Sequence, residues 1–421
     1  MIKYILIGFV VALIIGSFLN SYNDANKNNN EFYSNPASTQ HNDQLNQSVI
    51  KSELQDSNQN VKPNNQAESI DLGQNNDSKD YATYVQQGST KFGLKDFEGA
   101  LKDYNQAIEL IPKNDPYCTL VYAGRGRVRD ELGDFKGAIE DLNQAIKLNG
   151  ENTIAYYGRG LARSKSGDYK GAINDYSKAI KLDPGYSLAY YGRGYARTNL
   201  GDKGALNDYN QAIKLDPGNV NAYNDRGNLF LALGNKKGAL NDYNKAIKLD
   251  PEYSLAYYGR GYARSGLGDS KGALKDYNQA IKLDPENANA YNDRGNLFLA
   301  LGNKKSALND FNKAITLDPK IAGAYFGRGG LRSISGDKAG ALSDYNQTIE
   351  LNPKDEKAYI VRGYIRYELG DNEGALKDYD HAIELDSNDA FAYYLRSKLR
   401  KMLGSEAGAA SDYRKYLELS K

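Results

Sequence analysis

The fold is decided by a unit whose central copies read SLAYYGRGYARSGLGDSKGALKDYNQAIKLDPEN over Ser254–Asn287 and ANAYNDRGNLFLALGNKKSALNDFNKAITLDPK over Ala288–Lys320. Within each copy, apolar and small residues recur at i, i+3, i+4 and i+7 in two runs of roughly 13 residues. In most copies a Leu-Gly-Asp or Leu-Gly-Asn tripeptide separates the two runs. The pattern predicts a helix, a tight turn and a second helix.

The unit is repeated in tandem from about Asp80 to the C-terminus. An alanine opens the second half of each copy, at spacings of 38, 34 and 33 residues and then six times 34 (Ala100, Ala138, Ala172, Ala205, Ala239, Ala273, Ala307, Ala341, Ala375, Ala409). One helical hairpin cannot bury its apolar face alone, so a period of this length indicates an array in which each copy is stabilised by its neighbours.

The copies resemble the tetratricopeptide repeat (TPR) family, which places an aromatic residue near the start, Gly four residues later, an Ala pair around an aromatic, and Pro near the end. In the sixth copy these are Tyr257, Gly261, Ala273, Tyr277, Ala280 and Pro285. Tyr replaces the usual Trp throughout, and Arg almost always replaces the first-half Leu. The resemblance implies an all-α fold, a right-handed alpha-solenoid of about ten TPR helix-turn-helix repeats over residues 80–421. It also implies a non-catalytic protein-protein interaction scaffold.

Individual residues of the unit have predictable physical roles. Gly268 can adopt the positive φ that often ends a helix. Gly261 lacks a Cβ where two helices must approach, and the neighbouring alanines keep the facing surface shallow. Pro285 has no N–H to donate, so it is expected to end the second helix of its copy.

Residues 1–19 form a segment of different character, since Tyr4–Leu19 (YILIGFVVALIIGSFL) is an almost uninterrupted apolar run behind Lys3. We expect it to meet a membrane, either as an uncleaved signal anchor or as a cleaved signal peptide. As a helix it would span about 24 Å, short of a hydrocarbon core of roughly 30 Å unless its flanks contribute. Phe18 and Leu19 occupy positions where a cleavage site needs small residues. Lys3 favours an array that lies outside the cytoplasm, membrane-anchored or exported.

Residues 20–79 are crowded with Asn, Gln, Ser, Asp and Lys and contain few apolar side chains. Such a segment cannot bury enough surface to offset the entropy lost on ordering. We therefore expect a disordered Asn-rich linker that tethers the array.

Composition excludes several classes of function. The formal net charge is +1 with 25% charged residues, which gives no strong field for nucleic acid. One cysteine, Cys118, allows no intrachain disulfide, and two histidines, His41 and His381, are too few for a metal centre or a catalytic triad. We expect no enzyme activity, no metal and no cofactor. The recurring Gly-Arg-Gly tripeptide lies inside predicted helices without a following Gly-Lys-Ser or Gly-Lys-Thr, so it does not indicate a nucleotide site.

Two charged series run in step through the repeats. An Arg recurs in nearly every first helix (Arg125, Arg159, Arg193, Arg226, Arg260, Arg294, Arg328, Arg362, Arg396), and an Asp recurs in every second helix (Asp103, Asp141, Asp175, Asp208, Asp242, Asp276, Asp310, Asp344, Asp378, Asp412). The favoured interpretation is a structural ladder of ion pairs between helices. The alternative is that the arginines bind anions.

The TPR resemblance implies that first helices line a concave groove, with the positions one and five residues after the leading Tyr pointing into it. In the central copies these positions alternate between tyrosine and asparagine (Tyr191, Tyr195, Asn224, Asn228, Tyr258, Tyr262, Asn292, Asn296). Asn supplies both a donor and an acceptor for a peptide bond, and Tyr supplies rigid contact area. We expect these side chains to be exposed and to bind a protein or an extended peptide. A glycan or cell-wall surface is the alternative function, and simple inheritance through duplication is the alternative origin of the pattern.

Overall fold

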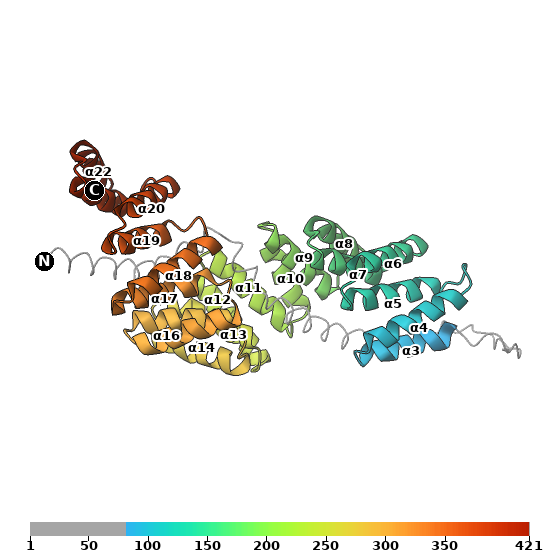
Figure 1. Cartoon of the computed structure of the whole chain (residues 1–421). Helices are drawn as coiled ribbons and strands as arrows, with labels where there is room; N and C mark the ends of the chain where they lie inside the picture. Colours follow the sequence, from blue (N-terminus) through green and yellow to red (C-terminus); the bar gives the residue numbers. More distant parts are fainter. Residues whose placement is uncertain (1–80, 421) are drawn as a thin grey trace, which may run out of the picture. The chain divides into compact units, whose positions relative to one another are not determined.

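The computed structural model describes residues 81–420, which form α-helices and no strand (Figure 1). In chain order the helices are α3 (Tyr81–Gly93), α4 (Phe97–Leu110), α5 (Cys118–Glu131), α6 (Phe135–Leu148), α7 (Thr153–Lys165), α8 (Tyr169–Leu182), α9 (Ser187–Asn199), α10 (Ala205–Leu215), α11 (Val220–Ala232), α12 (Lys236–Leu249), α13 (Ser254–Ser265), α14 (Ser270–Leu283), α15 (Ala288–Ala300), α16 (Lys304–Leu317), α17 (Ala322–Ser335), α18 (Lys338–Leu351), α19 (Glu356–Glu368), α20 (Asn372–Leu385), α21 (Ala390–Met402) and α22 (Glu406–Leu419). The predicted anchor and linker, residues 1–19 and 20–79, lie outside the described residues.

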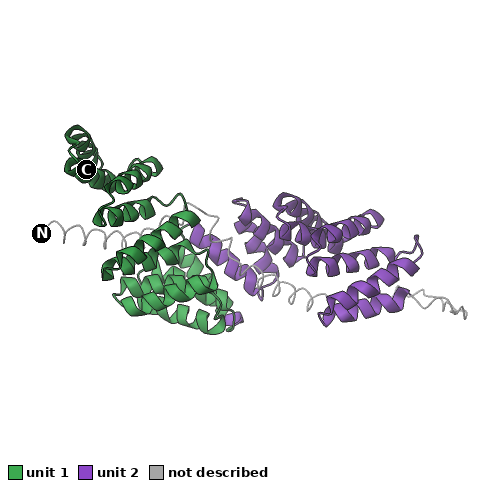
Figure 2. Cartoon of the chain, viewed as in Figure 1, with its two compact units in different colours: residues 1–28, 234–247, 251–421 green, residues 29–233, 248–250 purple. Residues whose placement is uncertain are grey.

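The helices follow one another as ten pairs, one for each copy of the sequence unit. We call the odd-numbered first helix of each pair its A helix and the even-numbered second helix its B helix. Within the described residues the chain forms two compact units, one of residues 81–233 with 248–250 and one of residues 234–247 with 251–420 (Figure 2). The all-α prediction of about ten TPR-like hairpins is confirmed, and the fold is an α-solenoid.

Helix packing within each unit repeats from copy to copy. Within each unit, A helices pack on the B helices of their own pairs, as α5 does on α6 and α13 does on α14. A helices also contact the A helices of neighbouring pairs, in the series α3, α5, α7, α9 and α11 of one unit and α13, α15 and α17 of the other. These contacts give each unit a continuous surface of A helices, which we call its A-helix face.

The turn between α13 and α14 confirms the sequence prediction. Gly268 has a φ of +83°, which a residue with a Cβ adopts only with strain. Asp269 follows it as the N-cap of α14, and its carboxylate accepts a hydrogen bond of 2.9 Å from the backbone N–H of Gly272. At the other end, α14 stops at Leu283 and Asp284 is extended before Pro285.

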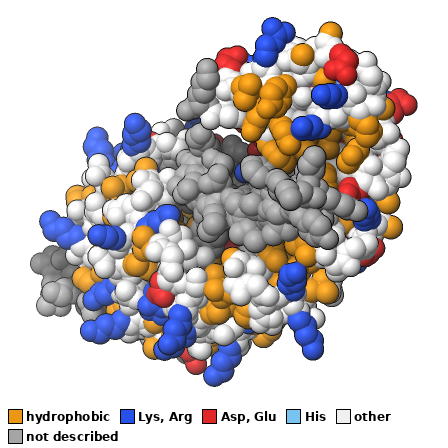
Figure 3. Space-filling model, turned by 90° about the vertical axis from the view of Figure 1, so that its left-hand side faces the viewer, with side chains coloured by type: hydrophobic (Ala, Val, Ile, Leu, Met, Phe, Trp, Pro, Cys, Tyr) orange, Lys and Arg blue, Asp and Glu red, His pale blue; other side chains and the backbone are white. Residues whose placement is uncertain are grey.

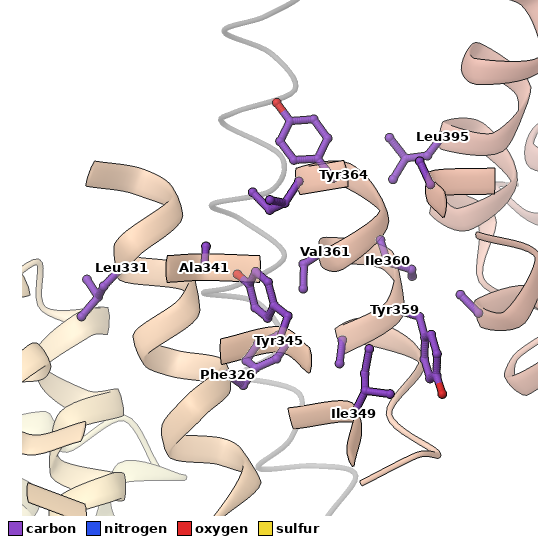
Figure 4. Close-up of a cluster of buried hydrophobic side chains, with 14 of the residues drawn as sticks. Phe326, Leu331, Ala341, Tyr345, Ile349, Tyr359, Ile360, Val361, Tyr364 and Leu395 are labelled. Carbon is purple, nitrogen blue, oxygen red and sulfur yellow. The ribbon is translucent and has the colours of Figure 1, made fainter. Parts of the chain in front are cut away.

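Close helix packing depends on small residues facing a buried aromatic ring. Ala273, Ala280 and Tyr277 are fully buried. A Cβ added to Gly261 would lie 3.0 Å from the ring of Tyr277, so the glycine allows α13 and α14 to approach. Near the C-terminus a larger core forms, in which the ring centroids of Phe326 and Tyr345 lie 5.7 Å apart and Ile360 is also buried (Figure 4). None of the helices formed by residues 81–420 combines the length and hydropathy needed to cross a membrane.

Candidate functional site

In most pairs, the arginine–aspartate ladder holds the A helix to the B helix of the same pair. The guanidinium of Arg260 donates from Nε to Oδ2 of Asp276 at 2.9 Å and from Nη2 to Oδ1 at 2.6 Å, a bidentate pair. The same geometry recurs in Arg125–Asp141, Arg159–Asp175, Arg193–Asp208, Arg294–Asp310, Arg328–Asp344, Arg362–Asp378 and Arg396–Asp412. The prediction of a structural ladder is confirmed.

The same arginines also join neighbouring pairs. Nη1 of Arg260 donates to the side-chain oxygen of Asn244 in α12 at 2.7 Å, and its guanidinium lies over the ring of Tyr257 at 5.4 Å. Since Nε, Nη1 and Nη2 all donate within the protein, this guanidinium is committed to packing. An anion-binding role for these arginines is therefore not favoured by their geometry.

A second arginine of the unit was missed by sequence reasoning. Arg264, one turn after Arg260, donates from Nη1 to Oδ2 of Asp276 at 2.8 Å. Most copies repeat this contact (Arg129, Arg163, Arg197, Arg332, Arg366 and Arg400). The spacing of two arginines at i and i+4 was the available signal, because such residues share one face of a helix.

The predicted groove residues lie on the A-helix faces, but they are less exposed than expected. Tyr191 is 1% exposed and Asn224 is 3% exposed. The other predicted groove residues are half-buried (Tyr195, Asn228, Tyr258, Tyr262, Asn292 and Asn296). The expectation that these side chains are exposed is wrong, because contacts between neighbouring A helices cover them.

An aspartate links the tyrosine and asparagine positions. In one unit, the hydroxyl of Tyr258 on α13 donates to Oδ2 of Asp293 on α15 at 2.9 Å, and Nδ2 of Asn292 donates to its Oδ1 at 3.1 Å. The other unit repeats the arrangement: Tyr191 on α9 donates to Asp225 on α11 at 2.7 Å, and Asn224 donates to it at 3.1 Å. The alternating pattern therefore holds successive A helices together.

These networks leave acceptors that no protein group satisfies. The Oδ1 atoms of Asn224, Asn292 and Asn296 are buried and receive no hydrogen bond. Burial also raises the pKa of Asp293 to about 6, an effect that the hydrogen bonds from Tyr258 and Asn292 oppose. An unsatisfied buried acceptor costs about 1–3 kcal/mol, so these positions are suited to a ligand that donates hydrogen bonds.

The first pair carries a cleft on the A-helix face of its unit. It has a volume of about 450 Å³ and lies between α3 and α5 (Tyr81, Ala82, Val85, Gln86, Ser89, Thr90, Tyr117, Leu120 and Val121). None of these side chains is charged. Leu120 is 54% exposed and Tyr117 is 60% exposed, so both present apolar surface at the cleft. Sequence reasoning missed this cleft, because no motif of the first copy distinguishes it.

The remaining candidate groups have ordinary structural contacts. Cys118 is the first residue of α5, and its buried thiol donates to the carbonyl oxygen of Pro112 at 3.2 Å. The ring of His381 packs against Tyr359, and its Nδ1 lies 3.1 Å from Glu384. Within residues 81–420 no three His, Cys, Asp or Glu side chains are grouped so that they could hold a metal ion. On the face drawn in Figure 3, basic side chains are scattered among hydrophobic ones.

Family models for the repeat match most of the array. A TPR repeat model matches residues 126–167, 163–201, 202–234, 227–268, 266–302 and 363–404. Two further tetratricopeptide repeat models match residues 288–321 and 81–114. The chain belongs to the tetratricopeptide repeat family.

Several solved TPR structures are similar to this TPR chain. A tetratricopeptide repeat protein from Parabacteroides merdae is 24% identical, with a TM-score of 0.46 over 59% of this chain and 98% of that one. YrrB, described as a TPR protein with an unusual peptide-binding site, is 26% identical, with a TM-score of 0.37 over 44% and 95%. Yeast Tom70 is 18% identical, with a TM-score of 0.40 over 80% and 92%. No curated protein matches the sequence.

Membership of the TPR family gives this chain the architecture of a protein-interaction scaffold. The ladder accounts for the arginine and aspartate series as packing groups. The A-helix face of one unit carries the cleft between α3 and α5, and the A-helix faces of both units carry asparagine oxygens that receive no hydrogen bond.

Proposed function

We propose that this TPR chain is a non-catalytic scaffold that binds a protein partner through an extended peptide on the A-helix face. The observation that carries the proposal is the uncharged cleft between α3 and α5, where Tyr117 and Leu120 present exposed apolar surface. Val85 and Ser89 of this cleft occupy, in the first copy, the same helix positions as the tyrosines and asparagines of the central copies. An apolar side chain of the partner would enter the cleft, and its backbone would pair with polar groups alongside.

The polar groups along the cleft suit a peptide backbone. Gln86 offers both a donor and an acceptor, and the hydroxyl of Ser89 can do either. The hydroxyl of Thr90 donates to the backbone carbonyl oxygen of Gln86 at 2.8 Å and can still accept a hydrogen bond. All three side chains are exposed. These polar groups lie beside the apolar side chains of the cleft. The site therefore fits an extended peptide that buries one side chain and forms hydrogen bonds through its main chain.

Site-specific photo-crosslinking tests this proposal. A photoreactive amino acid placed at Ser89 or Leu120 should form adducts with discrete partner proteins in the native host. The matched control is Lys271, an exposed residue at the start of the B helix α14. Adducts of equal yield and identity from Lys271 would contradict a site on the A-helix face. Adducts with glycan in place of protein would support the glycan-binding alternative.

We also propose that the array is held at a membrane outside the cytoplasm, or is exported, through residues 4–19. The support is the apolar run of the sequence, YILIGFVVALIIGSFL, together with the polar linker that follows it. A tethered scaffold would search for partners close to the membrane, where the linker raises their effective concentration.

A further inference from the structure

The strongest unexplained feature of the array is a set of acceptor atoms on one helix, α15. Asn292 and Asn296 stand four residues apart and therefore share one face, with about 5–6 Å between their Cβ atoms. The Oδ1 atom of each is buried and accepts no hydrogen bond. Asp293 lies between them in the sequence. Its carboxylate accepts hydrogen bonds from two neutral groups, the hydroxyl of Tyr258 and the amide of Asn292.

The hydrogen bonds of the site fix which way the amide of Asn292 faces. Its Nδ2 group donates to Oδ1 of Asp293 at 3.1 Å, because a carboxylate can only accept. The opposite orientation would place two oxygens against each other. Asn292 must therefore present its oxygen, and not its nitrogen, to the space beyond α15.

The next A helix carries a glycine opposite this amide. A Cβ added to Gly323 of α17 would lie 3.5 Å from Oδ1 and 3.6 Å from Nδ2 of Asn292. Gly323 thus leaves the amide uncovered by a side chain. All of these residues belong to the unit of residues 234–247 and 251–420, so the site is built within one compact body.

We propose that Asn292, Asp293 and Asn296 form a binding site for a primary ammonium group, supplied by a lysine side chain of a peptide bound on the A-helix face of this unit. An ammonium carries three N–H donors and no acceptor, so it can satisfy both asparagine oxygens while its charge faces the carboxylate. A carboxylate or phosphate ligand would add acceptors where acceptors are already in excess. This inference rests on the proposed peptide-binding function and names the side chain that the site selects.

A peptide array probed with the full-length chain in detergent tests the assignment. Each capped peptide is displayed in matched versions that carry lysine, acetyl-lysine, arginine or norleucine at one position. Acetylation removes the charge and two of the three donors while keeping the stem. The affinity for the lysine versions is expected to exceed that for the acetyl-lysine versions by about tenfold, because one charge-assisted hydrogen bond changes affinity by about this factor.

Variants of the chain separate this site from general peptide binding. Asn292→Ala with Asn296→Ala should reduce lysine-peptide binding to the acetyl-lysine level, whereas Asn309→Ala, an exposed residue of α16, should leave it unchanged. Circular dichroism must show equal helicity in all variants. Equal binding of lysine and acetyl-lysine versions would overturn the ammonium site while leaving peptide binding intact. Absence of binding to every peptide would instead contradict the proposed function itself.

Discussion

Arg260 and Asp276 form a bidentate ion pair in which the carboxylate is 1% exposed and the guanidinium side chain 15% exposed. Because Arg260 also reaches Asn244, one residue ties together three helices of two successive pairs. The same bidentate pair recurs in most hairpins of the array, so these arginines and aspartates are used in packing.

The first prediction concerns this ion pair. Arg260→Ala should lower the melting temperature measured by circular dichroism, since Asp276 would remain buried with only Arg264 beside it. The cost should be about 2 kcal/mol, less than the 3–5 kcal/mol typical of a buried charge left with no partner. Lys271→Ala, at an exposed position of α14, is the control and should be neutral. An unchanged melting temperature with loss of partner binding would reassign the arginine to recognition.

The second prediction concerns the hydrogen bond that the hydroxyl of Tyr258 donates to Asp293. Tyr258→Phe removes the hydrogen bond and keeps the ring packed against Tyr277, so unfolding in urea should require about 1 kcal/mol less free energy. Tyr257→Phe on the same helix is a matched substitution that does not touch this aspartate. Equal stability of the Tyr258 variant and the parent would show that the bond contributes nothing to the array.

The third prediction concerns pH. Burial raises the pKa of Asp293 from 3.8 to about 6 in the folded chain, so the folded state binds a proton more readily than the unfolded one. Stability contributed by this group is therefore lost as pH rises through the interval between these values. Asp293→Asn removes that dependence.

Urea unfolding of the parent and of Asp293→Asn, at about pH 5 and about pH 7.5, measures the effect. When the pH is raised from about 5 to about 7.5, the free energy of unfolding of the parent should fall by about 1 kcal/mol more than that of the variant. Parallel changes in both chains would mean that Asp293 titrates as an ordinary exposed carboxyl group.

The fourth prediction concerns location. Full-length chain should fractionate with membranes through residues 4–19, whereas a chain beginning near Asp80 should be soluble and helical. N-terminal sequencing of the native protein is the accompanying measurement. A mature chain that starts near residues 20–25 in the soluble fraction would show that the apolar segment is a cleaved signal.

The repeat architecture could be predicted from the sequence because its signals are local. Gly268 requires a positive φ, Asp269 caps the next helix, and Pro285 follows the end of α14, as the structure confirms. The pairing of the Arg and Asp series was also predictable, since the two occur in step in nearly every hairpin. These features depend on neighbours within one copy of the unit.

The chemistry of the A-helix face was harder to predict, because it depends on contacts between copies. Asn224 was predicted to be exposed and is buried, since Tyr191 of the preceding A helix and Asp225 close a hydrogen-bonded network around it. A tyrosine and an aspartate 34 residues apart give no local sign that they bond. The cleft beside Leu120 likewise depends on how α3 and α5 pack.

The most direct test of the account compares partner capture by the full-length parent chain with capture by two variants, using the native membrane fraction as the source of partners. One variant carries Leu120→Glu in the cleft together with Asn292→Ala and Asn296→Ala. The other carries Asn309→Ala and Lys271→Ala, at exposed positions of B helices. The account predicts that the first variant loses the partner at unchanged helicity and that the second retains it. Retention by the first variant, or loss by the second, would contradict recognition by the A-helix face.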